Sequence, residues 1–389
     1  MDVGKLKTSV IRQIDRNRQR LSELARNIHD NPEPGFQEVK AVAWLTQFLE
    51  ENGFSVKRGI CRLPTAFRAS YGRGRPVVAF IAEYDALPGI GHACGHNISG
   101  TISAGAAVAA KLVVDQFAGC ITVIGTPAEE LYAGKAIMAK RGAFSDLDAA
   151  MMVHSGTGNT AITHALACQN LYIEFFGQAA HAAARPEMGI NALEAMIQSF
   201  NAINSLRQHI KSSARIHGII TDGGQASNVV PDHCAGEFIV RATENDYLEE
   251  VKEKALNCFK GAATATGAKL KYKWDASRYA PMRNNMALAR LFADNMQSLG
   301  RPVDMTGSSS FGSTDMGNVS QIVPTIHANV AVAPRGTLLH SPEFAAAVTS
   351  EAAIDGLCDA ARTLAMIAVD LLTSPETLAE VKEEFRGEE

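Results

Sequence analysis

Residues 76–97 read PVVAFIAEYDALPGIGHACGHN, and this stretch holds both a strand signal and a group of metal-capable side chains. Its continuous apolar run, VVAFIA, predicts a strand that is buried on both faces, as is typical of parallel sheets. The run ends at Asp85, and a glycine-rich segment with Cys94 and His96 follows. We therefore expect an α/β fold whose first core strand leads directly into polar residues.

Two later stretches repeat this pattern. CITVIGTPAEE is an apolar run that ends at Glu129 and Glu130, and DAAMMVHSG is another that ends at His154. Helical segments over about residues 98–115 and 135–142 lie between the runs, so the predicted order is β-α-β-α-β. Ligands bind at the carboxyl ends of the strands in open α/β sheets, so we expect these side chains to gather at one edge.

The pattern changes near residue 168. From QNLYIEFFG to AKLKYKWDA the predicted order is β-α-β-β-α-β, which is the ferredoxin-like unit. We predict a mixed, mostly parallel sheet flanked by helices from residues 1–167 and 280–389, forming a catalytic metal-binding domain. Residues 168–279 are predicted to form an inserted α+β domain.

Helical spacing of apolar residues predicts the remaining long helices. An opening helix over about residues 5–30 ends at NPEPGF, and a second runs from about residue 38 to 52. A long helix is expected from 344 to 372, followed by a solvated acidic tail after Ser374.

Composition narrows the class of protein. The 389 residues are enough for two domains, and 46% apolar with 20% charged residues is ordinary for a folded chain. A net charge of -4 gives no basic surface for nucleic acid or an anionic membrane. We expect no signal peptide and no run of about 18 apolar residues that could span a membrane. Seven scattered cysteines predict reduced thiols and a cytoplasmic protein.

The strand-end residues include candidate metal ligands. Cys94 offers a thiolate, His96 and His154 offer imidazoles, and Glu130 offers a carboxylate. This mixture favours zinc or a similar late first-row ion over magnesium or calcium. The alternative is that GHACGHN is only a structural turn, and the short motif alone does not decide between the two. Glu130 and His154, which follow other predicted strands, could bind the same ion as Cys94 and His96, and this favours the metal site.

Adjacent glutamates suggest catalysis as well as binding. One carboxylate of the pair can bind metal while its neighbour takes a proton from water. We assign Glu129 as the base and Glu130 as the ligand, although spacing alone allows the reverse. Two solvated glutamates at a helix start would look the same. Asp85 can orient a ligand histidine, or it can simply begin the DALPG turn.

Taken together, these motifs resemble a known family across nearly the whole chain. The resemblance is to the two-metal amidohydrolases and peptidases of the aminoacylase and carboxypeptidase superfamily, in the branch of p-aminobenzoyl-glutamate hydrolase, indole-acetyl-amino-acid hydrolases and related dipeptidases. It rests on EYDALPGIGHACGHN, GTPAEE, MMVHSG, GQAAHAAARPEMGINALEA, GGQASNVVPD, GSTDMGNVS and GTLLHSPEF, in the family's order.

The resemblance implies a set of metal ligands. They hold two divalent ions, zinc or manganese with cobalt as an alternative, and are Cys94, His96, Glu130, His154 and His340. It also implies Glu129 as the general base and Asp85 as the residue that orients a ligand. On its own, a lone histidine such as His340 reads as a structural side chain.

The resemblance also implies roles for the inserted domain, as a lid and as the contact that forms a homodimer. His181 is then expected to reach the active site of the partner subunit and stabilise the oxyanion. Asn228 and Arg241 are expected to help hold the substrate. Arg241 is the weakest of these assignments, because a solvent-facing arginine on a strand would give the same pattern.

The expected function is metal-dependent hydrolysis of an amide bond in a small N-acyl or aminoacyl amino acid, releasing a free amino acid. The substrate is dipeptide-like or aminobenzoyl-glutamate-like and has a free carboxylate. Many relatives that hydrolyse auxin conjugates have aspartate where this chain has Asn97. This difference argues weakly against an auxin-conjugate substrate. The alternatives are a hydrolase that uses Cys94 as its nucleophile, and a metal-binding relative without catalysis.

Overall fold

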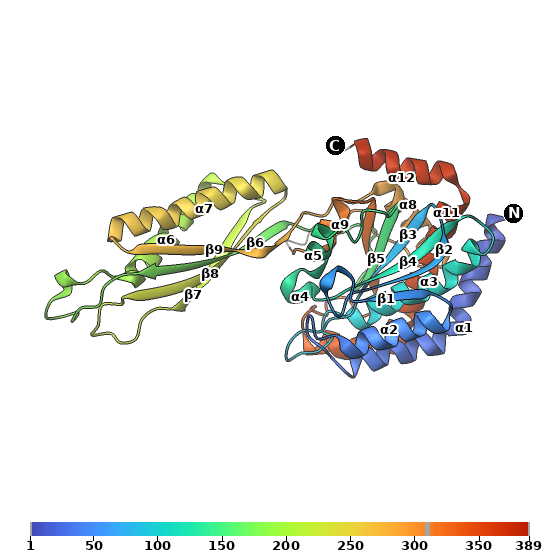
Figure 1. The fold of residues 1–389 in the computed structure, drawn as a ribbon, viewed down its shortest axis with the longest axis horizontal. Helices are drawn as coiled ribbons and strands as arrows, with labels where there is room; N and C mark the ends of the chain where they lie inside the picture. The colour runs from blue at the N-terminus through green and yellow to red at the C-terminus, as the bar shows by residue number, and fades with distance from the viewer. Residues whose placement is uncertain (1, 308–311, 388–389) are drawn as a thin grey trace. The chain divides into compact units, whose positions relative to one another are not determined.

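The structure is a computed structural model that describes residues 2–307 and 312–387. It divides into two compact units (Figure 1). Unit 1 takes Met1–His164, Met282–Ser310 and Asp315–Glu389, and unit 2 takes Ala165–Pro281 and Phe311–Thr314.

Unit 1 is built on a six-stranded sheet in the order β1-β2-β4-β3-β5-β10. The strands are β1 (Ser55–Arg58), β2 (Phe67–Arg73), β3 (Val77–Glu83), β4 (Gly119–Thr126), β5 (Ala149–Gly156) and β10 (Thr325–Ala331). The four neighbouring strands β4, β3, β5 and β10 are parallel to one another, and β2 runs antiparallel to both of its neighbours, β1 and β4. The predicted mixed, mostly parallel sheet is therefore confirmed, although β1 and β2 were not predicted.

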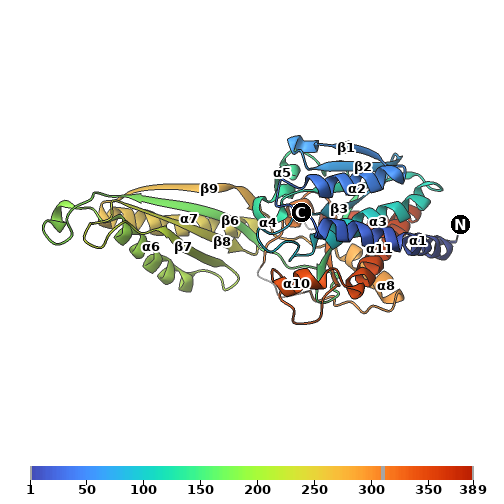
Figure 2. The ribbon, with the colours of Figure 1, turned by 90° about the horizontal axis from the view of Figure 1, so that it is seen from below.

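Strand β3 is buried on both faces, as its apolar run predicts. Val78 and Phe80 pack into one core, and Val77, Ala79 and Ile81 pack into another on the opposite face. The first core is covered by α1 (Val3–His29), α2 (Val39–Glu51), α3 (His96–Val114), α8 (Met286–Ser298) and α11 (Glu351–Thr373). The second is covered by α5 (Gly134–Lys140) and α9 (Met316–Ser320). Figure 2 shows α1 and α2 in front of the sheet.

Helix α3 is the central helix of unit 1. By length and composition it could cross a membrane, contrary to the expectation that no segment reaches that length. Its apolar window is 83% buried inside the unit, however, as the core helix of a folded domain would be. Small residues allow this close packing, and a Cβ on Gly100 would lie 2.4 Å from the carbonyl oxygen of Glu83.

The C-terminal region differs from its prediction in two ways. The single helix expected from 344 to 372 is two helices, α10 (Pro342–Ala347) and α11, because Ser350 caps α11 by accepting from the Ala353 N–H. The tail after Ser374 is helical, which was not predicted, although its residues are mostly exposed or half-buried as expected. Residues Pro375–Gly387 form helix α12, in which Val381 is fully buried.

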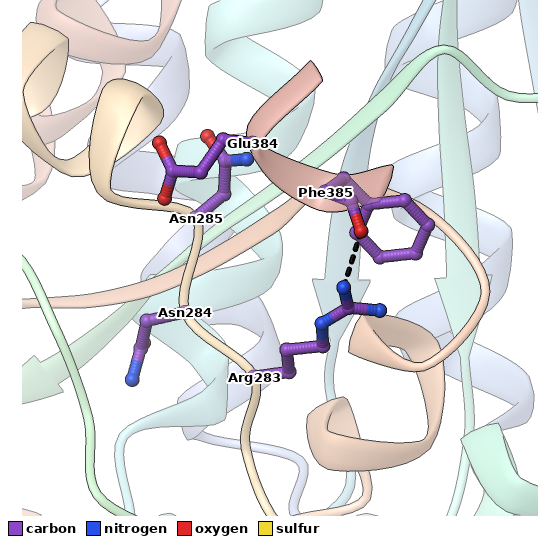
Figure 3. A pocket seen from close by; sticks show the side chains of 5 residues that line it. All are labelled: Arg283, Asn284, Asn285, Glu384 and Phe385. Atoms are coloured by element: carbon purple, nitrogen blue, oxygen red, sulfur yellow. Dashed lines mark hydrogen bonds between the residues drawn. The ribbon is translucent and has the colours of Figure 1, made fainter. Parts of the chain in front are cut away.

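Figure 3 shows where α12 meets the start of α8. The Asn285 side chain donates to the Val381 carbonyl at 2.9 Å, and Glu384 accepts from the Ala287 N–H at 2.8 Å. The Arg283 guanidinium lies 4.3 Å from the centre of the Phe385 ring and donates to the Phe385 carbonyl. An acidic tail is thus ordered because its few apolar residues and one carboxylate have specific partners.

Unit 2 is a four-stranded antiparallel sheet in the order β7-β8-β6-β9. Its elements are β6 (Ala167–Phe176), α6 (Ala192–Leu206), β7 (Arg215–Asp222), β8 (His233–Ala242), α7 (Asn245–Thr266) and β9 (Lys269–Tyr279). Both helices lie side by side on one face of the sheet (Figures 1 and 2). This order and strand pairing are those of a ferredoxin-like unit.

The glycines of α3 provide a test of this packing. Gly100→Ala is expected to destabilise unit 1 by about 1–3 kcal/mol, because its Cβ would collide with the backbone at Glu83. Gly105→Ala is the control, since its Cβ would meet only the Leu21 side chain, at 3.0 Å, and that side chain can move. Thermal unfolding measures both variants. Equal melting temperatures for the two would contradict the tight contact.

Candidate metal centre

Seven of the predicted site residues lie together in unit 1. They come from the ends of strands and the loops that follow them: Asp85 after β3, Cys94 and His96 at the start of α3, Glu129 and Glu130 at the start of α4 (Glu129–Tyr132), His154 in β5, and His340 before α10. Their ligand atoms form overlapping groups, within each of which all atoms lie within 4.8 Å of one another: Cys94 with His96 and His154, and Cys94 with Glu130 and His340. The carboxyl ends of the parallel strands therefore converge as expected.

Cys94 lies at the centre of this cluster. Its Sγ is 3.4 Å from Nε2 of His154 and 3.3 Å from Nε2 of His340. His340 is also 3.6 Å from a carboxylate oxygen of Glu130. The His340 N–H donates to the Ala93 carbonyl at 2.9 Å, and its backbone has a φ of 62°. The loop is thus tied beside Cys94 in a conformation that turns the imidazole toward the thiol.

Asp85 connects His96 to Glu130. One of its carboxylate oxygens lies 2.9 Å from His96 Nδ1, and the other accepts from the Glu130 N–H at 3.0 Å. Burial alone would raise the pKa of Asp85, but the neighbouring His96 lowers it below its ordinary value. An ionised Asp85 keeps the His96 proton on Nδ1 and leaves Nε2 free to bind a cation.

The cluster fits divalent ions on its own chemistry. Glu130 Oε1 is buried and has no hydrogen-bond partner among the described residues, and His96 Nε2 is buried without a hydrogen bond, 3.1 Å from the Glu83 carboxylate. Buried polar atoms are rarely left in this state, so such atoms call for a ligand. Burial also raises the pKa of the Cys94 thiol, so its thiolate requires a nearby positive charge. Thiolate, imidazole and carboxylate donors together suit zinc or a related ion.

Glu129 has the environment of a general base. Burial raises its pKa well above the ordinary value, and the negative charges of Asp315 and Glu83 add to this effect. A carboxylate with a raised pKa can take a proton and later release it near neutral pH.

Sequence reasoning missed a buried ion-pair cluster beside these residues. The Lys135 ammonium, which is fully buried, lies 2.9 Å from Glu83 and 2.8 Å from Asp315. Asp315 directly precedes α9, and its carboxylate also accepts from the Lys135 N–H at 2.8 Å. Glu83 lies 3.1 Å from His96 Nε2 and groups with His96 and Glu129. The position of Glu83 at the end of β3 could have identified it as a site residue. Lys135 gave no such signal, because a lysine in a helical segment is normally solvated.

Three other polar residues near the motif have different surroundings. His327, on β10, is buried with its ring 5.5 Å from that of His154, and burial lowers its pKa to about 3. His92 is buried but belongs to none of the ligand groups found among the described residues, in keeping with its omission as a ligand. Asn97 donates to the Ala25 carbonyl of α1 at 3.2 Å. Its amide therefore binds the backbone of α1, and the substrate preference inferred from Asn97 stays a prediction.

The other three predicted residues belong to unit 2. His181 is exposed, and its Nδ1 accepts from the N–H groups of Ala183 at 3.3 Å and Ala184 at 3.2 Å. A neutral imidazole that accepts at Nδ1 carries its proton on Nε2, so His181 presents a hydrogen-bond donor. Asn228 pairs with the same segment, because its carbonyl accepts from the Ala182 N–H at 3.0 Å. Arg241, on β8, donates to the Ser313 hydroxyl at 2.8 Å.

Comparison with known proteins shows the family to which this chain belongs. The model of peptidase family M20/M25/M40 matches residues 79–367. The chain is 34% identical to the Xaa-Arg dipeptidase of Mus musculus over 398 residues, covering 98% of this chain and 92% of the relative. It is 29% identical to one of the p-aminobenzoyl-glutamate hydrolase polypeptides of Escherichia coli K12, covering 96% of this chain and 93% of the relative.

Solved structures show the same fold. The YxeP protein of Bacillus subtilis, described as a dinuclear metal-binding peptidase of family M20, aligns with a TM-score of 0.73 at 22% identity, covering 92% of this chain and 99% of that one. The aminobenzoyl-glutamate utilization protein of Klebsiella pneumoniae aligns with a TM-score of 0.71 at 20% identity, covering 92% and 97%. With its ligand cluster, its paired glutamates and a family match over most of its length, this chain belongs to peptidase family M20/M25/M40.

Proposed function

We propose that this protein hydrolyses the amide bond of a small dipeptide-like or N-acyl amino acid with a free carboxylate, and releases an amino acid. Its family makes it an amide hydrolase. The observation that carries the proposal is the Glu129–Glu130 pair beside the thiolate and imidazole donors, because a purely structural metal site has no use for the second carboxylate.

The relatives support this substrate class. The substrates in their names, a dipeptide ending in arginine and p-aminobenzoyl-glutamate, are both amides of an amino acid that keeps its carboxylate. We propose that Asn228 and Arg241 help to hold such a substrate. Asn228 is exposed and Arg241 is half-buried, and amide and guanidinium groups are suitable donors to a carboxylate.

In the mechanism, two divalent ions would be held by Cys94, His96, Glu130, His154 and His340. When bound, they supply an acidified water and polarise the amide carbonyl. Glu129 takes the proton of the attacking water and returns it to the leaving amine. Asp85 keeps His96 and Glu130 in place, and the His181 Nε2–H donates to the oxyanion. The thiolate of Cys94 favours zinc, with manganese and cobalt as alternatives.

We further propose a cytoplasmic homodimer joined through unit 2, which would act as a lid. The seven cysteines are all free thiols, in keeping with a reducing compartment. Strand β7 is an edge strand of its sheet, and its Ile219 and Ile220 are 62% and 40% exposed. An exposed apolar edge strand is suited to pairing with a second copy of the chain.

A substrate screen tests the proposed function. Protein reconstituted with zinc, manganese or cobalt is incubated with Xaa-Arg and other dipeptides, N-acyl amino acids and p-aminobenzoyl-glutamate, and the released amine is measured. We expect hydrolysis that a chelator abolishes and added metal restores. Activity that resists chelation but is lost on thiol alkylation would instead support Cys94 as a nucleophile, and failure on every substrate would reject the substrate class.

Replacing the base tests its assigned role. Glu129→Gln is expected to lower kcat by about 10²–10⁴-fold, because the amide cannot take the proton of the attacking water. Metal content, measured by plasma mass spectrometry, should remain at the wild-type level, with Glu130→Gln as the matched variant that loses metal. If Glu129→Gln loses metal and Glu130→Gln does not, then Glu129 is the metal ligand and Glu130 is the general base.

Mixing two inactive variants tests the homodimer. Glu129→Gln and His181→Ala are each expected to be inactive, because each removes a group that every site needs. If His181 serves the partner's site, one of the two sites in a mixed dimer is intact, so subunit exchange should restore about a quarter of wild-type activity. Activity is measured after unfolding and refolding the mixture. No recovery, with mixed dimers demonstrated by differential tags, would place His181 outside the partner's site.

A further inference from the structure

The segment Glu33–Glu38, EPGFQE, has no role in the function proposed so far. Its proline and glycine predict only the end of the first helix. In unit 1 it lies between α1 and α2, and it contacts both of the loops that hold the site's carboxylates.

The first contact is with the loop after β3. The Ala86 N–H donates to the Glu33 carbonyl at 2.9 Å, and Pro34 forms a β-bridge with Ala86. Ala86 directly follows Asp85, the residue that binds both His96 and the Glu130 N–H. The segment therefore anchors the loop from which Asp85 acts.

The second contact is with the turn that precedes Glu129. The Ala128 N–H donates to Glu38 Oε1 at 2.8 Å, and Glu38 is fully buried. Ala128 and Ala133, on either side of the four-residue helix α4, have φ values of 60° and 50°. A left-handed conformation is unfavourable for alanine, so it persists only where the surrounding structure holds it. Glu38 supplies one of the bonds that hold it.

Packing around α4 adds to this bond. A Cβ on Gly35 would lie 2.8 Å from the Ala128 Cβ, so the segment passes directly against the turn. Phe36 stacks on Tyr132, the last residue of α4, with ring centres 5.3 Å apart and planes inclined by 23°. The segment thus contacts the helix at both ends, with Glu129 and Glu130 between these contacts.

We propose that the Glu33–Glu38 segment positions the catalytic carboxylates, and that Glu38 is the positioning residue that fixes the Ala128 turn and with it Glu129 and Glu130. Glu38 acts through the backbone of Ala128. The inference rests on the proposed function, because it takes Glu129 as the residue that moves the proton.

The chain offers matched variants for a test. Glu38→Gln keeps an oxygen acceptor for the Ala128 N–H, and it is a small electrostatic change, because burial raises the pKa of Glu38 to about 7. Glu38→Ala removes the acceptor. Glu33→Ala is the control from the same segment, since the Glu33 carboxylate accepts from the N–H groups of Lys40 at 2.9 Å and Ala41 at 3.1 Å, at the start of α2.

We expect Glu38→Ala to lower kcat by about tenfold to a hundredfold through misplacement of the general base, with a smaller change in KM. Glu38→Gln should stay within about threefold of wild type, because the acceptor is preserved. Glu33→Ala keeps the backbone carbonyl that accepts from Ala86 and removes only the carboxylate at the start of α2, so it should lower the melting temperature and leave kcat unchanged. If Glu38 had a purely structural role, Glu38→Ala would, like Glu33→Ala, lower the melting temperature and leave kcat unchanged, and this result would overturn the proposal. A Glu38→Gln variant with a kcat as low as that of Glu38→Ala would overturn it as well.

Hydrogen exchange gives a readout that does not depend on activity. Exchange measured by mass spectrometry should be faster in peptides covering residues 127–134 for Glu38→Ala, and unchanged there for Glu33→Ala. If the wild type cleaves no substrate in the screen, the proposed function fails while this comparison still decides whether Glu38 holds the turn. Unchanged exchange in Glu38→Ala would overturn the proposal.

A second variant covers the case in which Glu38→Ala does not fold. Gly35→Ala keeps every hydrogen bond but places a Cβ against Ala128, so kcat should fall and exchange in residues 127–134 should rise. Gly158→Ala is its control, because a Cβ at Gly158 meets no atom within 4 Å. Wild-type behaviour of Gly35→Ala in both measurements would show that the contact does not set the turn.

Discussion

The site depends on the carboxylate of Asp85. One of its oxygens binds the His96 imidazole and the other binds the backbone N–H of Glu130, so a single buried side chain connects the start of α3 to the start of α4. A carboxylate with two such donors stays ionised and fixed in orientation. It sets the tautomer of His96 and the place of Glu130 together, and a change at Asp85 would therefore disturb two of the candidate ligands at once.

The parallel sheet explains why such a cluster can exist in a buried place. Neighbouring parallel strands end at the same edge, and β3, β4 and β5, with the loops that follow them, supply Asp85, Glu129, Glu130 and His154. Burial raises the pKa of Glu129, and repulsion from the neighbouring carboxylates of Asp315 and Glu83 raises it further. Lys135 offsets part of this repulsion by pairing with Glu83 and Asp315. Bound cations would offset the rest of the repulsion, so the same ions would both stabilise the buried carboxylates and support hydrolysis.

The sequence predicted those parts of the fold in which residue pattern and burial agree. Strands β3, β4 and β5 are continuous apolar runs, and their polar ends identified most of the cluster. Helix α12 was missed because its order comes from a few contacts, such as that of Glu384 with α8, which leave no periodic signal. Lys135 and Glu38 were missed because a charged residue in a helical region reads as solvated, and only the tertiary structure shows that each is buried with a partner.

The surroundings of Cys94 decide between its two chemical roles. A nucleophilic thiol needs a lowered pKa and access to the substrate, whereas burial raises the pKa of this thiol. Its nearest polar neighbours are the Nε2 atoms of two histidines, at 3.3 and 3.4 Å, and one of these histidines is also close to Glu130. A nucleophile with one base would leave the second imidazole and the carboxylate without a purpose. Cation binding uses all of them, and it also gives a partner to the buried Glu130 Oε1, which has no hydrogen bond among the described residues.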